Sequence, residues 1–255
     1  MTESIHGSAE NHLYRIEIRR AEKRNALTHE MYSALAGALE KAAVDDAVRV
    51  VLLLGAPGVF CSGNDIVDFL KNPPNHDHAP VFQFLRRLIH FEKPIVAGVA
   101  GMAVGIGTTM LLHCDYVVAS EDAQFSTPFV NIGLCPEAGS SVMLPLAIGH
   151  KRASEMLLFG DRVPAATMLD WGLVNAVVPN DKLVAAAEAR AGTLASKPSS
   201  AMRASKALLR RTLAPAAAEA MAAEVQEFAA LLQSSAAKEC LSAFLEKRAP
   251  DPAKF

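Results

Sequence analysis

The chain has 255 residues, of which 51% are hydrophobic and 20% are charged, and its formal net charge is −2. This composition is typical of a globular protein with a large apolar core. The small net charge argues against a nucleic acid as the main partner, because nucleic-acid-binding proteins usually carry an excess of Lys and Arg.

Signals for a membrane or a secreted location are not found in the sequence. No window reaches about 18 uninterrupted apolar residues, the length of a transmembrane helix. The N-terminus has no basic stretch followed by an apolar run. The cysteines form neither a CxxC pair nor a zinc-binding spacing; they are Cys61, Cys114, Cys135 and Cys240. We therefore expect a cytoplasmic protein with free thiols, no membrane partner and no metal site.

Short strands alternate with helices along the first two-thirds of the chain. Residues 12–20 alternate apolar and charged side chains, which indicates a half-buried strand. Thr28 can cap a helix that follows it. Apolar or strand-like runs predict strands at 50–54, 94–97 and 115–119, and helical patterns cover 82–89 and 107–113. This alternation predicts an α/β layered core.

Helical patterns dominate from about residue 150. They cover 153–159, 165–171, 183–194, 199–213, 216–233 and 236–247. The proline-rich stretch 72–80 is expected to form a loop. We predict a core that carries the active site over residues 1–195 and a helical oligomerisation region over 196–255. Some of the apolar side chains of this region are expected to pack on another chain, because they are more than one small helical layer needs; they are Leu208, Leu209, Met221, Val225, Phe228 and Leu232.

Two glycine-rich segments each lead from a predicted strand into a predicted helix. In residues 58–66, small side chains leave backbone N–H groups uncovered. In residues 98–109, Gly105-Ile106-Gly107 precedes a helix, and such a position favours an anion or a developing oxyanion. Either segment could also be a plain packing turn, with Asp65 near a helix start. The second lacks the third glycine of a dinucleotide-binding loop, because Met110 is in its place.

Glu137 is the acidic residue of an otherwise uncharged segment, Pro128 to Pro145. A carboxylate in apolar surroundings holds its proton more tightly, and its pKa can approach neutrality, as a general base requires. The alternative is an acid in the first turn of a surface helix. Together with two amide-bearing loops, one acid can stabilise an enolate that forms when a proton is removed next to a carbonyl.

Several segments, in order, resemble the crotonase (enoyl-CoA hydratase/isomerase) superfamily over nearly the whole chain. They are Ala21-Glu22-Lys23-Arg24-Asn25-Ala26-Leu27, the loops 58–66 and 100–109, Ala123-Gln124-Phe125, residues 171–179 and Phe244-Leu245-Glu246-Lys247-Arg248. The resemblance implies a spiral of β-β-α units with a helical C-terminal region, assembled as a homotrimer or a dimer of trimers. It implies an acyl-CoA thioester as the partner and no cofactor, because coenzyme A belongs to the substrate.

The resemblance also implies roles for individual residues. The backbone amides of Asn64 and Ile106 would form an oxyanion hole for the thioester oxygen, and Glu137 would be catalytic. The pantetheine and adenine path would be lined by Lys23, Arg24, Ala26, Ser62, Asp65 and Ile66. Water would be kept out by Phe129 and Leu134. The tail residues Phe244 and Lys247 would reach the coenzyme A of a neighbouring subunit.

Departures from the hydratase pattern decide the expected reaction. Hydratases of this superfamily carry one glutamate after the second loop and another after the Ala-Gln-Phe strand, whereas this chain has Thr109 and Phe129 there. Glu137 instead resembles the acid of peroxisomal-type Δ3,Δ2-enoyl-CoA isomerases. We therefore predict an isomerase that moves a 3-enoyl-CoA double bond to the 2-position. The alternatives are hydration or another crotonase-type reaction, and a non-catalytic acyl-CoA-binding scaffold.

Overall fold

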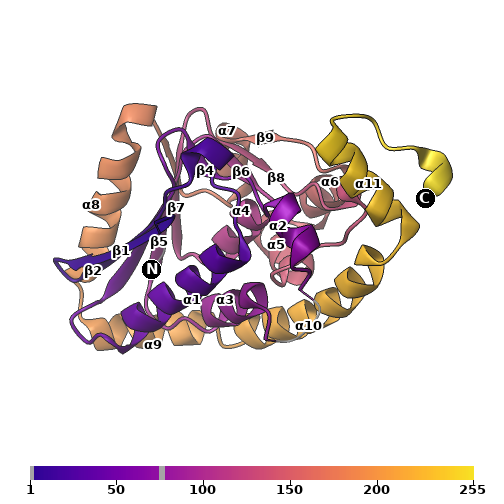
Figure 1. Ribbon diagram of the computed structural model, residues 1–255. Helices are drawn as coiled ribbons and strands as arrows, with labels where there is room; N and C mark the ends of the chain where they lie inside the picture. Colours follow the sequence, from indigo (N-terminus) through magenta and orange to yellow (C-terminus); the bar gives the residue numbers. More distant parts are fainter. Residues whose placement is uncertain (1–2, 75–77) are drawn as a thin grey trace.

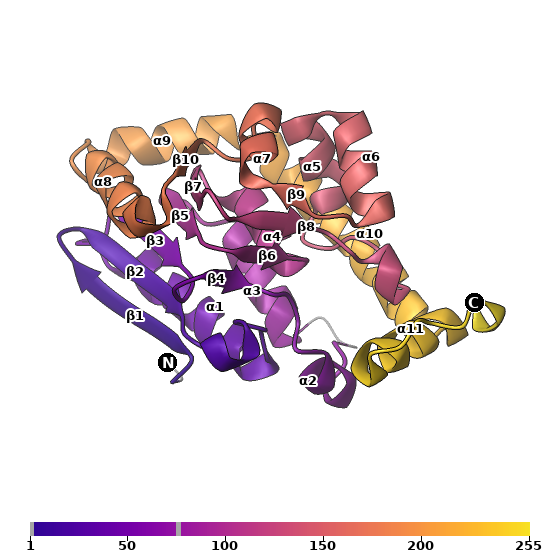
Figure 2. The same ribbon diagram turned by 90° about the horizontal axis from the view of Figure 1, so that it is seen from above.

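Two β-sheets form the centre of the molecule in the computed structural model, which describes residues 3–74 and 78–255 (Figures 1 and 2). The larger sheet has the strand order β1-β2-β3-β5-β7-β10, and the smaller has β4-β6-β8-β9. The strands of the larger sheet are β1 (Ile5–Glu10), β2 (Leu13–Ile18), β3 (Val50–Leu54), β5 (Ile95–Val99), β7 (Tyr116–Ser120) and β10 (Ala176–Val178). Those of the smaller are β4 (Val59–Cys61), β6 (Met102–Val104), β8 (Gln124–Ser126) and β9 (Val163–Pro164).

Successive pairs of strands divide between the two sheets. β3, β5 and β7 pair in parallel in the larger sheet, and the strands that follow each of them, β4, β6 and β8, pair in parallel in the smaller. Helical segments follow each pair before the chain returns to the larger sheet. The predicted α/β spiral of β-β-α units is therefore confirmed.

Eleven α-helices surround the sheets in the described residues. They are α1 (His29–Val44), α2 (Ile66–Lys71), α3 (Pro80–Ile89), α4 (Ile106–Thr109), α5 (Ser140–Ile148), α6 (His150–Phe159), α7 (Ala165–Trp171), α8 (Leu183–Ala195), α9 (Ser199–Leu209), α10 (Leu213–Leu232) and α11 (Ser235–Glu246). None of these helices is long and apolar enough to cross a bilayer.

Several local predictions agree with the structure. Thr28 is the N-cap of α1, and its side chain accepts a hydrogen bond from the amide of Met31 at 3.3 Å. The strand predicted at 50–54 is β3, which is buried along its whole length. In the predicted loop, Pro80 instead begins α3, because proline suits the first helical turn. Residues 75–77 of that loop lie outside the described residues.

Other elements differ from the prediction. The helix expected at 107–113 is α4 followed by a 3-10 helix, Met110–His113. Helix α5 and the strand β1 were not expected, and β9 and β10 interrupt a region expected to be helical. The strands β4, β6 and β8 have three residues each, too few for an alternating pattern to be visible.

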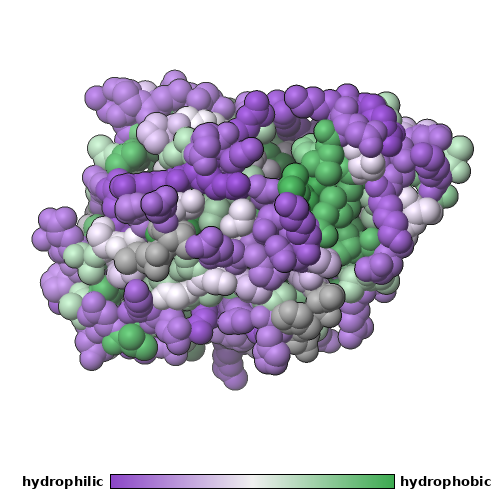
Figure 3. All heavy atoms as spheres, in the orientation of Figure 1, coloured by the Kyte–Doolittle hydropathy of each residue, from purple (hydrophilic) through white to green (hydrophobic). Residues whose placement is uncertain are grey.

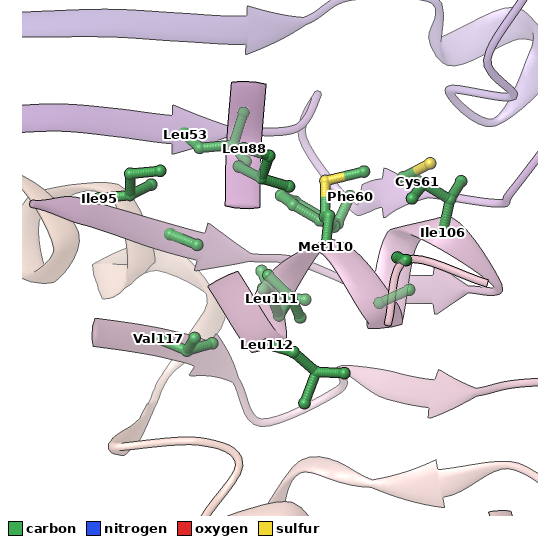
Figure 4. Packing of buried hydrophobic residues seen from close by; sticks show 14 of the residues in the cluster. Leu53, Phe60, Cys61, Leu88, Ile95, Ile106, Met110, Leu111, Leu112 and Val117 are labelled. Carbon is green, nitrogen blue, oxygen red and sulfur yellow. The ribbon is translucent and has the colours of Figure 1, made fainter. Parts of the chain in front are cut away.

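Buried side chains from both sheets converge on α4 and the 3-10 helix after it (Figure 4). Phe60 of β4, Ile95 of β5 and Val117 of β7 belong to this cluster, together with Ile106 and Met110. A second cluster covers the opposite face of the larger sheet, where α8 packs on it. Because the residues of α4 are packed within the first cluster, the loop that leads into this helix has a fixed position.

Helices α9, α10 and α11 form an arc along one side of the molecule (Figure 1). Helix α10 contacts α3 and α5 of the same chain. Met221 and Phe228 are buried within their own chain, with 6% and 9% of their surface exposed, so they are not among the side chains available to another chain. Leu208 and Leu209 of α9 remain exposed. The C-terminal region thus belongs in part to the core of its own chain.

Candidate active site

The two glycine-rich loops lie against each other. They follow β4 and lead out of β6, which are parallel neighbours. A β-carbon on Gly63 would lie 3.2 Å from the carbonyl oxygen of Val104, and one on Gly107 would lie 2.5 Å from that of Cys61. The backbones therefore approach so closely that Gly107 leaves no room for a side chain.

The segment of residues 21–27 holds the first loop from the other side. The amide of Leu27 donates to the carbonyl of Gly63 at 2.8 Å, and the amide of Asp65 donates to the carbonyl of Leu27 at 2.9 Å. The buried side-chain amide of Asn25 donates to the carbonyls of Val59 and Phe60, each at 3.0 Å. These hydrogen bonds show that residues 21–27 hold the loop of residues 58–66 in place.

The amides of Asn64 and Ile106 come from these two loops. Ile106 is the first residue of α4, so its N–H has no acceptor within the helix. In the described part of the chain, neither amide donates to a protein acceptor. Two free N–H groups on adjoining loops suit an oxygen that gains negative charge during a reaction.

Glu137 lies between α4 and α5, in the turn before Ser140. The hydroxyl of Thr109, which is fully buried, donates to Oε1 of Glu137 at 2.5 Å. Burial raises the pKa of Glu137 to about 8, the Thr109 hydrogen bond acts in the opposite direction, and the charge of Glu224 raises the pKa further. This agrees with the raised pKa expected from the sequence.

The backbone after Glu137 is fixed by a buried histidine. Ala138 has a left-handed backbone, with φ of 63°. Its carbonyl lies 2.8 Å from Nε2 of His113, so this nitrogen carries the proton, and Nδ1 lies 3.2 Å from Nη2 of Arg210. Burial lowers the pKa of His113 to about 4, in keeping with a neutral ring. Ser140 adds a hydroxyl donor to the Glu137 carbonyl at 2.6 Å.

A largely apolar pocket opens beside Glu137. Its walls come from α1, α3, α10 and residues 64–74. In the orientation of Figure 1, apolar side chains line a hollow between α2 and α11 (Figure 3). Phe69 of α2 and Phe228 of α10 line the pocket with their rings 5.9 Å apart. This pocket can accommodate an acyl chain next to the carboxyl group.

Glu137 is not the only acid in the pocket. Asp68 and Glu224 also line it. Asp68 accepts from the amide of His29 at 2.7 Å and from Asn72 at 3.1 Å, one bond at each oxygen. Both oxygens of Glu224 also accept hydrogen bonds. In the described residues, Oε2 of Glu137 alone among the six carboxyl oxygens has no donor.

The residues expected along the coenzyme A path come together at the first loop. The amide of Ser62 donates to the carbonyl of Arg24 at 3.1 Å, and Ile66 begins α2 directly after this loop. Lys23 and Arg24 are exposed there, and Ala26 is half-buried. Coenzyme A contacts by these residues stay a prediction.

Asp65 has a structural role in this region. Its Oδ1 accepts from the amides of Val67 and Asp68 at 3.1 and 3.2 Å, and its Oδ2 accepts from Arg20 at 2.8 Å. Burial acts to raise the pKa of Asp65, but the Arg20 bond and the helix amides lower it overall. Its side chain therefore caps α2, which is the alternative given by the sequence.

Phe129 and Leu134 do not line the pocket. Phe129 is 5% exposed and belongs to the main core, and its ring lies 3.7 Å from where a β-carbon on Gly105 would be. Leu134 is buried against Phe228 and Ala237. They support the pocket from behind, and their role in keeping water from the substrate stays a prediction.

Phe244 and Lys247 are exposed at the end of α11. Contact with a neighbouring subunit's coenzyme A stays a prediction.

Sequence reasoning missed Tyr32 and Glu224. The hydroxyl of Tyr32 donates to Oδ1 of Asn64 at 2.5 Å and both residues line the pocket. Glu224 had a visible signal, because it shares the apolar helical face of Met221, Val225 and Phe228. No three His, Cys, Asp or Glu side chains are grouped to hold a metal ion within residues 3–74 and 78–255.

Comparisons with known proteins cover almost the whole chain. Residues 8–253 match the family model described as enoyl-CoA hydratase/isomerase. Enoyl-CoA delta isomerase 2 of Rattus norvegicus is 37% identical over 210 residues, or 80% of this chain, and the chain spans about half, 54%, of that protein. The 2,3-dehydroadipyl-CoA hydratase of Escherichia coli K12 is 34% identical over 92% of this chain and 93% of that protein. An enoyl-CoA hydratase/isomerase structure from Pseudoalteromonas atlantica T6c has a TM-score of 0.94 and 40% identity, covering 98% of this chain and 99% of that one.

Proposed function

The chain belongs to the enoyl-CoA hydratase/isomerase (crotonase) family and has its fold, and from this premise we propose that it is an enoyl-CoA isomerase. The family acts on acyl-CoA thioesters. The proposed reaction moves the double bond of a 3-enoyl-CoA to the 2-position. One observation carries the proposal: of the three acids that line the pocket, only Glu137 has an oxygen without a donor in the described residues.

The proposed mechanism uses one base and two amides. Oε2 of Glu137 removes a proton from C2, and the electrons of that C–H bond form a dienolate with its charge on the thioester oxygen. The amides of Asn64 and Ile106 stabilise this oxygen. Glu137 then delivers the proton to C4, which leaves the double bond between C2 and C3. A pKa of about 8 suits both steps, because the group must accept and return a proton near neutrality.

Hydration of a 2-enoyl-CoA is the second candidate, and the similarity to the E. coli hydratase favours it. Hydration requires one group to activate water and another to deliver a proton at C2. Thr109 and Phe129 occupy the positions of the two hydratase glutamates, and Glu224 and Asp68 already accept hydrogen bonds at both oxygens. These features support isomerisation over hydration.

The proposal includes further properties of the protein. The base and the two amides supply each step, so we propose no cofactor beyond the coenzyme A of the substrate. The homotrimer or dimer of trimers, the cytoplasmic location and the absence of a nucleic-acid partner stay predictions.

The test compares 3-enoyl-CoA and 2-enoyl-CoA substrates with the wild type and Glu137→Gln. We expect isomerisation by the wild type and a loss of roughly 10²- to 10⁴-fold in the variant, with acyl-CoA binding retained. A substrate deuterated at C2 should carry deuterium to C4 only when Glu137 is present. Faster hydration than isomerisation by the wild type would contradict the proposal, and binding without turnover would favour the scaffold.

A further inference from the structure

Glu224 is a buried carboxyl group on the pocket side of α10, with 6% of its surface exposed. Its Oε2 accepts a hydrogen bond from the amide of Gly139 at 2.7 Å. Its Oε1 accepts from the amide and from the hydroxyl of Ser141, at 2.9 and 2.6 Å. One side chain of the C-terminal region therefore satisfies three donors of the turn that follows Glu137.

That turn has an unusual backbone. Ala138 and Gly139 have φ values of 63° and 70°, so two successive residues are left-handed. A left-handed alanine is strained and persists only where its surroundings determine it. A β-carbon on Gly139 would lie 2.7 Å from the carbonyl oxygen of Ala217, so the turn is pressed against α10. Helix α10 thus supplies both the wall and the acceptors that fix this turn.

We propose that Glu224 is a positioning residue, which orders the turn of residues 137–141 so that the Glu137 carboxyl group faces the acyl pocket. This inference rests on the proposed function, because it assigns Glu137 as the base. Glu224 does not itself exchange a proton with the substrate, since both of its oxygens accept hydrogen bonds from the turn. Met221, Val225 and Phe228 line the same pocket from α10. The helix that contacts the acyl chain therefore also holds the base.

Glu224 also acts on Glu137 through its charge. It adds to the rise of the Glu137 pKa that burial causes. The other titratable groups around Glu137 are Tyr32, Cys61 and Cys135, and burial raises the pKa of each, to about 12 for Cys61 and about 11 for Cys135. These three stay neutral at pH 6–9. His29 and Asp68 also line the pocket, and His113 bonds to the turn.

The first experiment measures kcat, KM and the pH profile of 3-enoyl-CoA isomerisation in Glu224→Gln. Loss of positioning should lower kcat roughly 10- to 100-fold, as a misplacement of about 1 Å does, with KM little changed. Loss of the charge should move the rise of kcat with pH to lower pH. Glu219→Gln on the exposed side of α10 is the matched control and should behave as the wild type.

Glu224→Asp separates the two effects, because it retains the charge but shortens the side chain. We expect its kcat to fall while the rise with pH stays where it is in the wild type. If Glu224→Gln does not fold, Glu224→Asp still tests the positioning role. An unchanged kcat and pH profile in both variants would overturn the proposal.

A second measurement does not need turnover. Hydrogen exchange of the Gly139 and Ser141 amides should be faster in Glu224→Ala than in the wild type or in Glu219→Ala, because both amides lose their acceptor. Unchanged exchange would overturn the positioning role even if Glu137 is confirmed as the base. If exchange accelerates but the wild type does not isomerise 3-enoyl-CoA, the proposed function fails and Glu224 still orders the turn.

Discussion

Single side chains decide the chemistry of this site, and Glu137 is the most informative of them. Burial moves its pKa from an ordinary 4.5 to about 8. The sequence could predict the direction of this change, because residues 128–145 contain no other charged residue. It could not predict the partners, because Thr109, His113 and Glu224 lie 28, 24 and 87 positions away along the chain.

The raised pKa of Glu137 has a consequence for stability. Between pH 4.5 and about 8 the folded protein keeps a proton that the unfolded chain has lost. The free energy of unfolding therefore falls as the pH rises through this window. The Glu137→Gln variant has no ionisable group at this position, so its free energy of unfolding does not fall through this window. Its Tm should therefore exceed that of the wild type at pH 9 and equal it at pH 4. Thermal denaturation at both pH values measures this, with Glu219→Gln as the control. An equal difference in Tm between the variant and the wild type at pH 4 and pH 9 would contradict the raised pKa of Glu137.

Thr109 makes a second prediction possible at this scale. Its hydroxyl group lowers the pKa of Glu137 against the effect of burial. Thr109→Val removes the donor at nearly constant volume, so the rise of kcat should move to higher pH. Thr109→Ser keeps the donor and should leave the profile in place. A shift to lower pH in the valine variant would show that the bond does not stabilise the ionised base.

The burial of Thr109 and Phe129 also predicts the outcome of introducing the two hydratase acids. Restoring acids by Thr109→Glu with Phe129→Glu places one carboxyl group at a fully buried position beside Glu137 and another in the main core. Like charges at such distances oppose ionisation, and a buried charge is costly. We therefore expect loss of stability before any gain of hydration.

At the scale of elements, α10 links the C-terminal region to the site. Its buried face consists of Ala217, Met221, Glu224 and Phe228. The periodic pattern predicted the helix but not its neighbour, because an apolar stripe fits the core of its own chain as well as another subunit. Helix α5 was missed because it is apolar on most sides and contains Pro145. Short strands such as β4 and β6 form through pairing, which no local pattern reveals.

The elements around the pocket also restrict the acyl group. Three carboxyl groups line the pocket, on α2, α10 and the turn before α5, and the described lining residues include no Lys or Arg. An acyl chain that ends in a carboxylate would lose hydration and meet like charges. Adipoyl-CoA should therefore bind at least about 10-fold more weakly than hexanoyl-CoA. Titration calorimetry with Glu137→Gln measures both without turnover, and equal affinities would contradict this reading of the pocket.

At the scale of the whole molecule, the order of several motifs along the chain predicted the fold. No single motif would have sufficed, because each also fits an ordinary turn. The surface leaves large apolar side chains exposed on α6 and α9, including Phe159 at 66% and Leu209 at 75%. Such side chains usually lie in contacts between subunits.

Light scattering should give a mass that is a multiple of three chains at micromolar concentration. Phe159→Glu or Leu209→Glu places a charge on a face that we expect to be covered, and at least one of them should lower that mass. Ala43→Glu, at an exposed position of α1 that carries no large apolar side chain, is the control. A monomeric wild type would contradict the expected trimer.

The close approach of Gly63 and Gly107 to the opposite loop has an evolutionary consequence. The two free amides belong to the backbone, so substitutions of most side chains leave the proposed oxyanion hole unchanged. The base, by contrast, is one side chain, and a single substitution can remove it or create it elsewhere on the pocket wall. A lineage with this scaffold can therefore exchange one reaction for another without refolding, provided that the strand pairing of β4 with β6 persists.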